Sequence, residues 1–97
     1  MKNDKPQVEI RAFSFLKEIF DQRGWPFPLY YTLDEECPAA ELAGALDLPF
    51  EKIEAVFING LAHPFEKAIV KPGDRIAFLP PGTPGPYRVL LGIKKLT

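Results

Sequence analysis

Hydrophobic and polar residues alternate along two stretches of this chain, which is the pattern of a β-strand with one buried face. The first stretch is VEIRAF at 8–13 and the second is FPLYYTL at 27–33. Pro28 favours an edge position or a strand start for the second, because proline cannot donate a ladder hydrogen bond. We therefore predict two strands that form a hairpin with a long, partly helical connection.

Two further segments carry apolar residues at helical spacing. FLKEIF at 15–20 is followed by Gly24 and predicts a short helix or turn. The second segment begins at Pro38, which suits the first turn of a helix, and its pattern ends at Pro49. Its apolar face consists of Ala39, Leu42, Ala43 and Leu46. We expect this second segment to be the main helix.

The second half of the chain has the pattern of short strands and turns. EAVFING at 54–60 is rich in β-branched and aromatic residues and closes on Asn-Gly, a strong hairpin signal. LAHPF is typical of a short edge element, KPGD at 71–74 of a turn, and RIAFL at 75–79 of a last strand. This order predicts an α+β roll, a mixed four- to five-stranded sheet with one main helix packed across one face.

Length, composition and charge narrow the functional classes. A chain of 97 residues with 46% hydrophobic and 26% charged residues is typical of one globular domain. The formal net charge of −1 provides no field that would recruit nucleic acid or an anionic membrane. The single cysteine, the lack of a signal-peptide pattern and the lack of an apolar run of about 20 residues favour the cytoplasm.

The residues that could do chemistry are few. His63 and Cys37 are the single histidine and cysteine, 26 positions apart, which is too few ligands for a closed metal site. We expect His63 to be exposed or capping and Cys37 to be a capping or half-buried residue, with the nearby acids disfavouring its thiolate. Ser14 has no partners that indicate a catalytic triad. We therefore predict no catalytic residue, no metal and no cofactor.

Four segments, in this order, resemble the MoaD/ThiS family of sulfur carriers. They are VEIRAFSFLKEIF, PAAELAGALDLPF, VFINGLAH and KPGDRIAFLPPGTPG, and together they cover about residues 7–85. The family includes the small subunit of molybdopterin synthase and the thiamine sulfur carrier. The resemblance implies a ubiquitin-like β-grasp fold for residues 1–85 and a link to molybdopterin, tungstopterin or thiamine cofactor biosynthesis.

The chain departs from that family at the position of the carrier terminus. Family members carry sulfur as a thiocarboxylate on a C-terminal Gly-Gly, and alignment places Pro84 and Gly85 at those two positions. Proline has a fixed φ where the family needs a thin tail, and residues 86–97 follow. The resemblance is therefore to an atypical member without the Gly-Gly. Gly85 is a candidate thiocarboxylate position only if the Gly85-Pro86 bond is cut.

Residues 86–97 form a C-terminal extension with its own character. YRVLLGI at 87–93 is apolar and β-prone, so it needs a surface to cover. It either packs on its own domain as an added strand or on the sheet, adds to another chain in a homodimer or partner, or is disordered. The extension carries +3 and residues 1–85 carry −4. The candidate partner-binding residues are Phe78, Pro80, Pro81, Tyr87, Arg88, Val89, Leu90 and Leu91.

These observations favour a non-enzymatic protein-binding module. The resemblance implies an E1-like adenylyltransferase or a cofactor-pathway enzyme as the partner, with no nucleic acid and no membrane involved. One alternative is a genuine sulfur carrier that is activated as a thiocarboxylate after cleavage at Gly85. A second alternative is a self-associating domain that uses the extension as a swapped strand.

Overall fold

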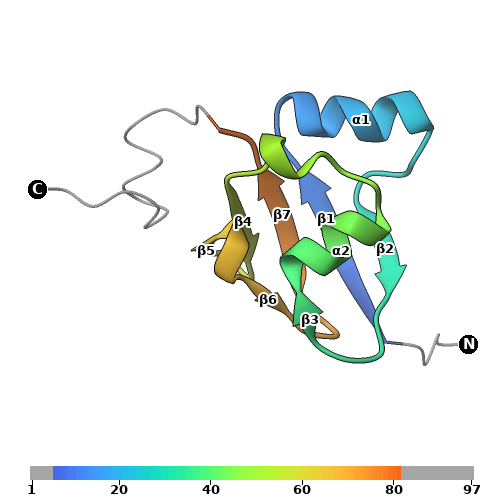
Figure 1. Ribbon diagram of the computed structural model, residues 1–97. Coiled ribbons are helices and arrows are strands. Elements are labelled where there is room, and N and C mark those ends of the chain that lie inside the picture. Colours follow the sequence, from blue (N-terminus) through green and yellow to red (C-terminus); the bar gives the residue numbers. More distant parts are fainter. Residues whose placement is uncertain (1–5, 82–97) are drawn as a thin grey trace, which may run out of the picture.

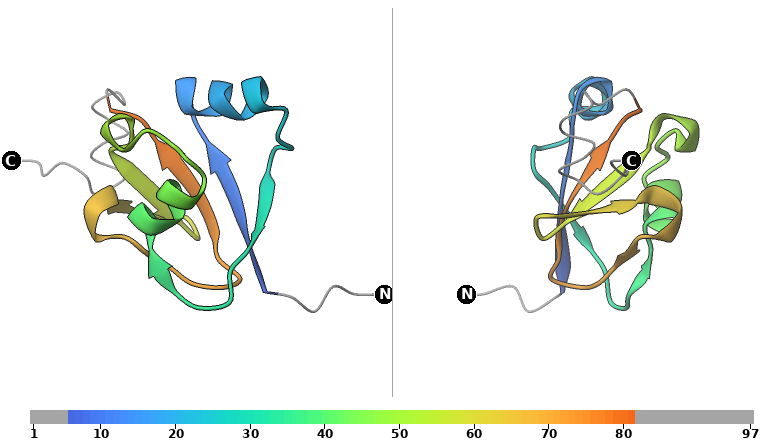
Figure 2. Two further views of the ribbon diagram at one scale, coloured as in Figure 1. Left: turned by 45° about the vertical axis from the view of Figure 1, so that its right-hand side comes forward. Right: turned by 90° about the vertical axis from the view of Figure 1, so that its left-hand side faces the viewer.

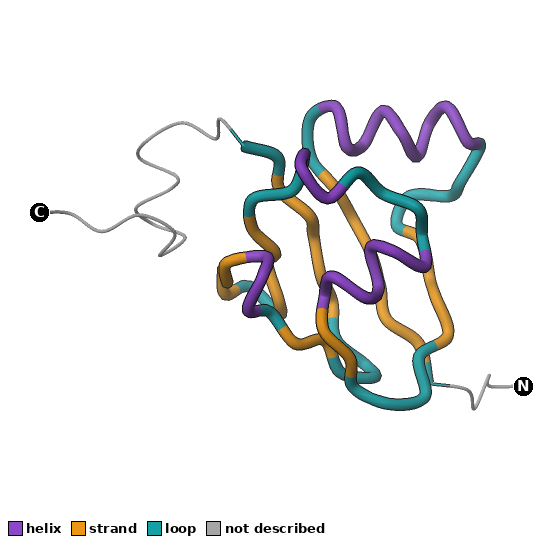
Figure 3. The backbone as a smooth tube through the Cα atoms, in the orientation of Figure 1, coloured by secondary structure: helices purple, strands orange, loops and turns teal. Residues whose placement is uncertain are grey.

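The computed structural model describes residues 6–81 and contains two α-helices, a five-stranded sheet and a two-stranded ribbon (Figure 1). The sheet consists of β1 (Gln7–Ala12), β2 (Leu29–Thr32), β4 (Ala55–Ile58), β5 (Leu61–Pro64) and β7 (Arg75–Leu79). The ribbon joins β3 (Cys37–Pro38) and β6 (Ile69–Val70). The α-helices are α1 (Phe15–Arg23) and α2 (Ala39–Ala45), and the short 3-10 helices are η1 (Phe50–Lys52) and η2 (Phe65–Lys67). Figure 3 shows how loops connect them.

The five-stranded sheet has the order β2-β1-β7-β4-β5. Strand β1 runs parallel to β7, and the other neighbouring pairs are antiparallel. A parallel pair requires a crossover connection, and α2 lies within the chain that connects β1 to β7. The predicted α+β class, the mixed sheet and the hairpin between the first two strands are therefore confirmed. The predicted boundary between residues 85 and 86 lies outside the described residues.

Alternation along the strands gives the sheet two different faces. In β1, Glu9 and Arg11 point to one side, which we call the outer face, while their neighbours point to the buried inner face. In the parallel register of β1 with β7, outward residues of one strand lie beside outward residues of the other, as Glu9 does beside Arg75. The inner-face residues of the three central strands are Val8, Ile10, Ala12, Val56, Ile58, Ile76 and Phe78.

Helix α2 lies across the inner face of the sheet, as the sequence predicts (Figure 2). Its residues Ala39, Leu42 and Ala43 are buried in the same core cluster as the inner-face strand residues. Pro38 has extended backbone angles, with φ −60° and ψ 144°, so it precedes the first turn instead of lying in it. Within residues 6–81 the core contains no buried polar or charged residue.

The end of α2 is set by a local turn before Pro49. Asp47 has a positive φ of 55°, and its N–H donates to the Gly44 carbonyl oxygen at 3.0 Å. The Leu48 N–H donates to the Ala43 carbonyl oxygen at 2.9 Å. These two hydrogen bonds satisfy carbonyl groups that the last helical turn leaves unpaired. The helix therefore ends through these backbone hydrogen bonds, and Pro49 lies after its end.

Helix α1 is more extensive than the expected short helix or turn. It contains nine residues and α2 contains seven, so the segment expected to be the main helix is the shorter one. Leu16 and Phe20 are buried, whereas the polar residues that continue the helix face solvent and carry no apolar signal. Gly24 ends the helix in the left-handed conformation, with φ 73°, which glycine adopts without steric cost.

The hairpin of β4 and β5 forms at the Asn-Gly turn that the sequence predicts. Asn59 and Gly60 have φ values of 51° and 89°, and positive φ at both central residues is what a type I′ turn requires. The Asn59 Oδ1 accepts a hydrogen bond from the Arg75 N–H at 2.9 Å, and its Nδ2 donates to Asp74 at 2.9 Å. The turn is thereby attached to the start of β7.

The β3–β6 ribbon and the two 3-10 helices are features that the hydrophobic pattern does not indicate. Cys37 pairs with Val70 and Pro38 with Ile69, and strands of two residues are too short to show alternation. The ribbon places β6 beside the start of α2. In the described part of the chain, no helix is long and apolar enough to cross a membrane.

Candidate functional site

The two faces of the five-stranded sheet are covered differently (Figure 2). Helix α2, both 3-10 helices and the ribbon lie on the inner side, and α1 lies across the end of the sheet. No helix among residues 6–81 lies across the outer face. The outer face therefore has no described helix over it, and its accessible part lies around Arg11, Phe13 and Arg75, since Ala55, Ala77 and Leu79 are buried.

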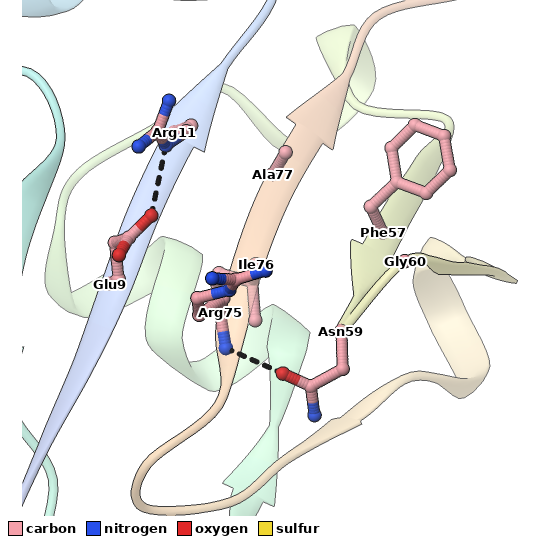
Figure 4. A pocket seen from close by; sticks show the side chains of 8 residues that line it. All are labelled: Glu9, Arg11, Phe57, Asn59, Gly60, Arg75, Ile76 and Ala77. Carbon is pink, nitrogen blue, oxygen red and sulfur yellow. Dashed lines mark hydrogen bonds and ion pairs between the residues drawn. The ribbon is translucent and has the colours of Figure 1, made fainter.

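One part of the outer face is polar and slightly hollowed (Figure 4). We call it the polar half and define it by Glu9, Arg11, Asn59 and Arg75. These residues, with the side chains between them, line a shallow depression of about 360 Å³. The parallel register of β1 and β7 places Glu9 opposite Arg75, and the β4–β5 turn supplies Asn59. The polar half thus depends on three segments that are distant in the sequence.

The charges of the polar half are only partly compensated. The Arg11 Nε donates to the Glu9 Oε2 at 2.9 Å, which forms an ion pair. The Arg75 guanidinium makes no hydrogen bond or ion pair with another described residue, although its backbone N–H is bound to Asn59. The polar half thus holds two cations and one anion, and the Asp74 carboxylate lies next to it, bound to the Asn59 Nδ2 at 2.9 Å. The Arg75 guanidinium is the group that an anionic side chain of a binding partner would meet here.

The remainder of the outer face is apolar. We call it the apolar half and define it by Phe13, Ala55, Phe57, Ala62 and Leu79. Ala55 and Leu79 are buried and form a second, smaller cluster, against which Phe57 and Ala62 pack. The rings of Phe13 and Phe57 meet edge to face with centroids 6.4 Å apart, and Phe13 remains 47% exposed. An exposed aromatic ring beside arginines is typical of a protein-binding surface.

The residues that the sequence nominated for partner binding have different positions. Phe78 is fully buried on the inner face, where its ring packs on Phe65 with centroids 6.4 Å apart. Its inward orientation follows from its pairing with the inner-face residue Ala12, so it offers no surface to a partner in this structure. Pro80 is also buried, whereas Pro81 is exposed. Gly85, Tyr87, Arg88, Val89, Leu90 and Leu91 lie outside the described residues.

Phe13, Phe57, Arg11 and Arg75 are not among the residues predicted from the sequence. The aromatic pair could have been predicted. Both phenylalanines occupy outward positions that alternate with buried residues, and a strand face that contacts only water would carry polar residues at those positions. No such signal existed for the arginines, since their proximity depends on the pairing of the first and last strands. The aromatic pair is thus the only part of this surface that could have been predicted from the sequence.

Other nominated residues behave largely as expected. Cys37 is half-buried, and burial, followed by the nearby Glu41 carboxylate, raises the pKa of its thiol above the ordinary value. The thiol therefore stays protonated at neutral pH and is a poor nucleophile. Among the nearby aromatic residues, Trp25 and Tyr31 pack against the core, whereas Tyr30 is 56% exposed. His63 lies half-buried on the edge strand β5.

The described residues bring together no group of three or more histidine, cysteine, aspartate or glutamate side chains that could hold a metal ion. In comparisons with protein-family models, with curated proteins and with solved structures, none matches the chain.

Proposed function

We propose that this protein is a non-enzymatic binding module of the MoaD/ThiS type, with a ubiquitin-like β-grasp fold, that binds a protein partner through the outer face of its sheet. The observation that carries the proposal is the exposed aromatic pair Phe13 and Phe57 beside the two arginines of the polar half. By resemblance, the partner is an E1-like adenylyltransferase or an enzyme of pterin-cofactor or thiamine biosynthesis in the cytoplasm.

The composition of the outer face supports protein binding over other uses. Aromatic and arginine side chains contribute disproportionately to protein interfaces, because they bury large areas and form directional hydrogen bonds. The Arg75 guanidinium has no partner among the described residues, so binding an anionic group there breaks no existing ion pair. A partner surface with a carboxylate next to apolar side chains would complement both halves.

The topology supports the family part of the proposal. A central parallel pair formed by the first and last strands, with a helix across one face, is compatible with a β-grasp roll. The last strand, β7, is central, and the family-like PP sequence follows it directly as Pro80 and Pro81.

Binding measurements on surface variants test this proposal. The full chain is titrated with the E1-like adenylyltransferase of the same organism, and with its pterin or thiamine pathway enzymes, by calorimetry. We expect Arg75→Glu and Phe13→Ser each to weaken binding by about tenfold or more, because both residues lie within the proposed interface. Lys67→Glu is the matched control, an exposed charge reversal in η2 outside the outer face, and it should leave the affinity unchanged.

Two results would overturn the proposal. If none of these enzymes binds, or if all three variants bind like the parent chain, the outer face is not the interface. Intact mass of the natively expressed protein adds an independent measurement. Loss of residues 86–97 with a gain of about 16 Da, for oxygen replaced by sulfur at Gly85, would establish a sulfur carrier instead.

A further inference from the structure

The two edge strands of the five-stranded sheet differ in how readily another strand can add to them. In the order β2-β1-β7-β4-β5, strands β2 and β5 each have a single neighbour. An edge strand presents unpaired N–H and C=O groups, and proteins commonly blunt such an edge with proline, lysine or a bulge. Figure 1 shows β2 at one side of the sheet, with no other described strand beyond it. The backbone of each edge decides whether a strand can be added there.

Strand β5 is blunted by its last residue. The Phe65 N–H donates to the Glu54 carbonyl oxygen at 3.1 Å, which fixes the phase of the β4–β5 ladder. Backbone groups alternate in direction along an antiparallel ladder, so those of Ala62 and Pro64 point to the free edge. Proline has no N–H, which leaves Ala62 as the one residue of β5 with an outward N–H. Strand β5 is therefore a poor template for another strand.

Strand β2 has no such protection. The Leu33 N–H donates to the Pro6 carbonyl oxygen at 3.0 Å, so Tyr31, two residues earlier, also directs its backbone groups to β1. The N–H and C=O groups of Tyr30 and Thr32 consequently point away from β1, and both residues are exposed. The sequence of β2, LYYT, contains neither proline nor lysine. Strand β2 therefore presents two complete sets of backbone groups at an open edge.

The sequence around β2 is complementary to itself. Leu29, Tyr31 and Leu33 alternate with exposed residues and pack, partly buried, against the core. This pattern is symmetric about Tyr31. When two copies pair antiparallel about Tyr31, each Leu29 lies opposite Leu33 of the other copy, and the two Tyr31 side chains face each other. Tyr30 then lies opposite Thr32, and their outward groups exchange hydrogen bonds. A two-fold contact requires this kind of self-complementarity.

Charge favours antiparallel over parallel pairing of the two copies. The acidic run DEE at 34–36 directly follows β2 and is exposed. Parallel pairing places the two acidic runs side by side, where they repel each other, whereas antiparallel pairing places them at opposite ends of the interface. In the antiparallel register the acidic run lies toward the uncharged PFP at 26–28 of the other copy. Helix α1, at the same end, has two basic and two acidic residues and adds no net charge.

We propose that two copies of this chain associate through β2, antiparallel about Tyr31, and join their sheets into one continuous sheet. The two-fold axis is perpendicular to the sheet, so the outer faces of both copies lie on the same side and remain open. A strand pair of this length is a small interface, so the dimer forms at micromolar or higher concentration. The inference does not rest on the proposed function, because no partner enzyme takes part in the contact.

The exchange of amide protons with water tests the proposal on the full chain. We expect the Tyr30 and Thr32 amides to exchange at least about threefold more slowly at about 1 mM than at about 20 μM chain, because pairing covers them. The Ala62 amide, at the other edge, should exchange equally at both concentrations. Sedimentation equilibrium over the same range should show the mass rising toward that of a dimer.

Two proline substitutions, each removing one outward N–H, are matched variants. Thr32→Pro spares the hydrogen bonds to β1 but removes a donor to the second copy, and should weaken association at least about tenfold. Ala62→Pro makes the same change in β5 and should leave association unchanged. Circular dichroism shows whether each variant is folded. Lysine at the same two positions gives the same comparison if a proline variant fails to fold, because an edge lysine also opposes strand addition.

A contact between Leu29 and Leu33 makes the register specific. Within one chain these residues are four positions apart along an extended segment, about 13 Å, which is too far for a nuclear Overhauser contact. We expect that contact between their methyl groups at about 1 mM chain. A monomer at this concentration, or a folded Thr32→Pro variant that associates like the parent, would overturn the proposal. Slower exchange at Ala62 in place of Tyr30 and Thr32 would also overturn it, by moving the interface to β5.

Discussion

Phe13 and Phe78 are joined by a backbone hydrogen bond, in which the Phe13 N–H donates to the Phe78 carbonyl oxygen at 3.1 Å, yet their side chains lie on opposite faces of the sheet. Phe78 is fully buried beneath the helical layer, whereas Phe13 is 47% exposed on the outer face. The inner face is closed by packing within the described chain. The outer face carries the Phe13–Phe57 pair and the Arg75 guanidinium, which has no ion pair among the described residues. The packing of the core does not require either of them.

Apolar content alone therefore does not distinguish residues that stabilise this sheet from residues that could bind a partner. Both faces contain phenylalanine, but only the inner face lacks charged neighbours and has a helix across it. A residue that stabilises the fold should therefore be separable by experiment from one that serves binding. The following substitutions test that separation.

The largest effect is expected for Phe78→Ala on the inner face. Truncating a fully buried phenylalanine leaves a cavity among side chains of the core, and the expected loss is about 3–5 kcal/mol of unfolding free energy. Chemical denaturation followed by circular dichroism measures it. A loss below about 1 kcal/mol would mean that the core relaxes around this position and that the inner face is not the stabilising one.

An intermediate effect is expected for Arg23→Ala, which tests how the helical layer over the inner face is held together. The Arg23 guanidinium donates to the Leu46 and Asp47 carbonyl oxygens at 2.6 and 2.7 Å and lies 4.7 Å from the Trp25 ring. It thus connects the end of α1 to the end of α2. We expect a loss of about 1–3 kcal/mol, because two hydrogen bonds to a charged donor disappear.

Arg23→Lys provides the control for that prediction. Lysine keeps the charge but cannot reach both carbonyl groups with a planar fork, so it should recover only part of the lost stability. Denaturation curves of both variants decide the point. Full recovery by lysine would show that the positive charge, and not the paired hydrogen bonds, is what matters.

The smallest effect on stability is expected for Phe13→Ser on the outer face. The substitution removes one edge-to-face contact with Phe57 from a half-exposed side chain, which corresponds to a loss of about 0.5–1.5 kcal/mol. The same denaturation experiment measures it alongside Phe78→Ala. A loss as large as that of Phe78→Ala would contradict the division between a structural and a binding face.

Much of the fold could be predicted because its signals are local. Alternation at 8–13, helical spacing after Pro38 and the Asn-Gly turn each act over a few residues, and the structure has the corresponding elements. The β3–β6 ribbon escapes such reasoning because each strand has two residues. Helix α1 extends beyond its apolar pattern because its last residues are polar and face solvent, and Gly24 ends it as the sequence indicates.

Less of the candidate site could be predicted. Phe78 was nominated from its position near the PP sequence, but strand parity directs its side chain into the core. Arg11 and Arg75 were not nominated, since 64 positions separate them in the sequence and only the pairing of β1 with β7 brings their strands together. Residues 82–97, where most nominated residues lie, are outside the described part of the chain.

The sequence by itself therefore determined most strands of the sheet, helix α2, the Asn-Gly turn and the class of fold, because propensity, periodicity and turn chemistry are properties of neighbouring residues. Only the tertiary structure decided that the first strand pairs with the last, that Phe13 meets Phe57, and that an uncompensated arginine lies beside them. The physical reason is that strand order is selected by the burial of the whole inner face. The composition of the outer face follows from that selection.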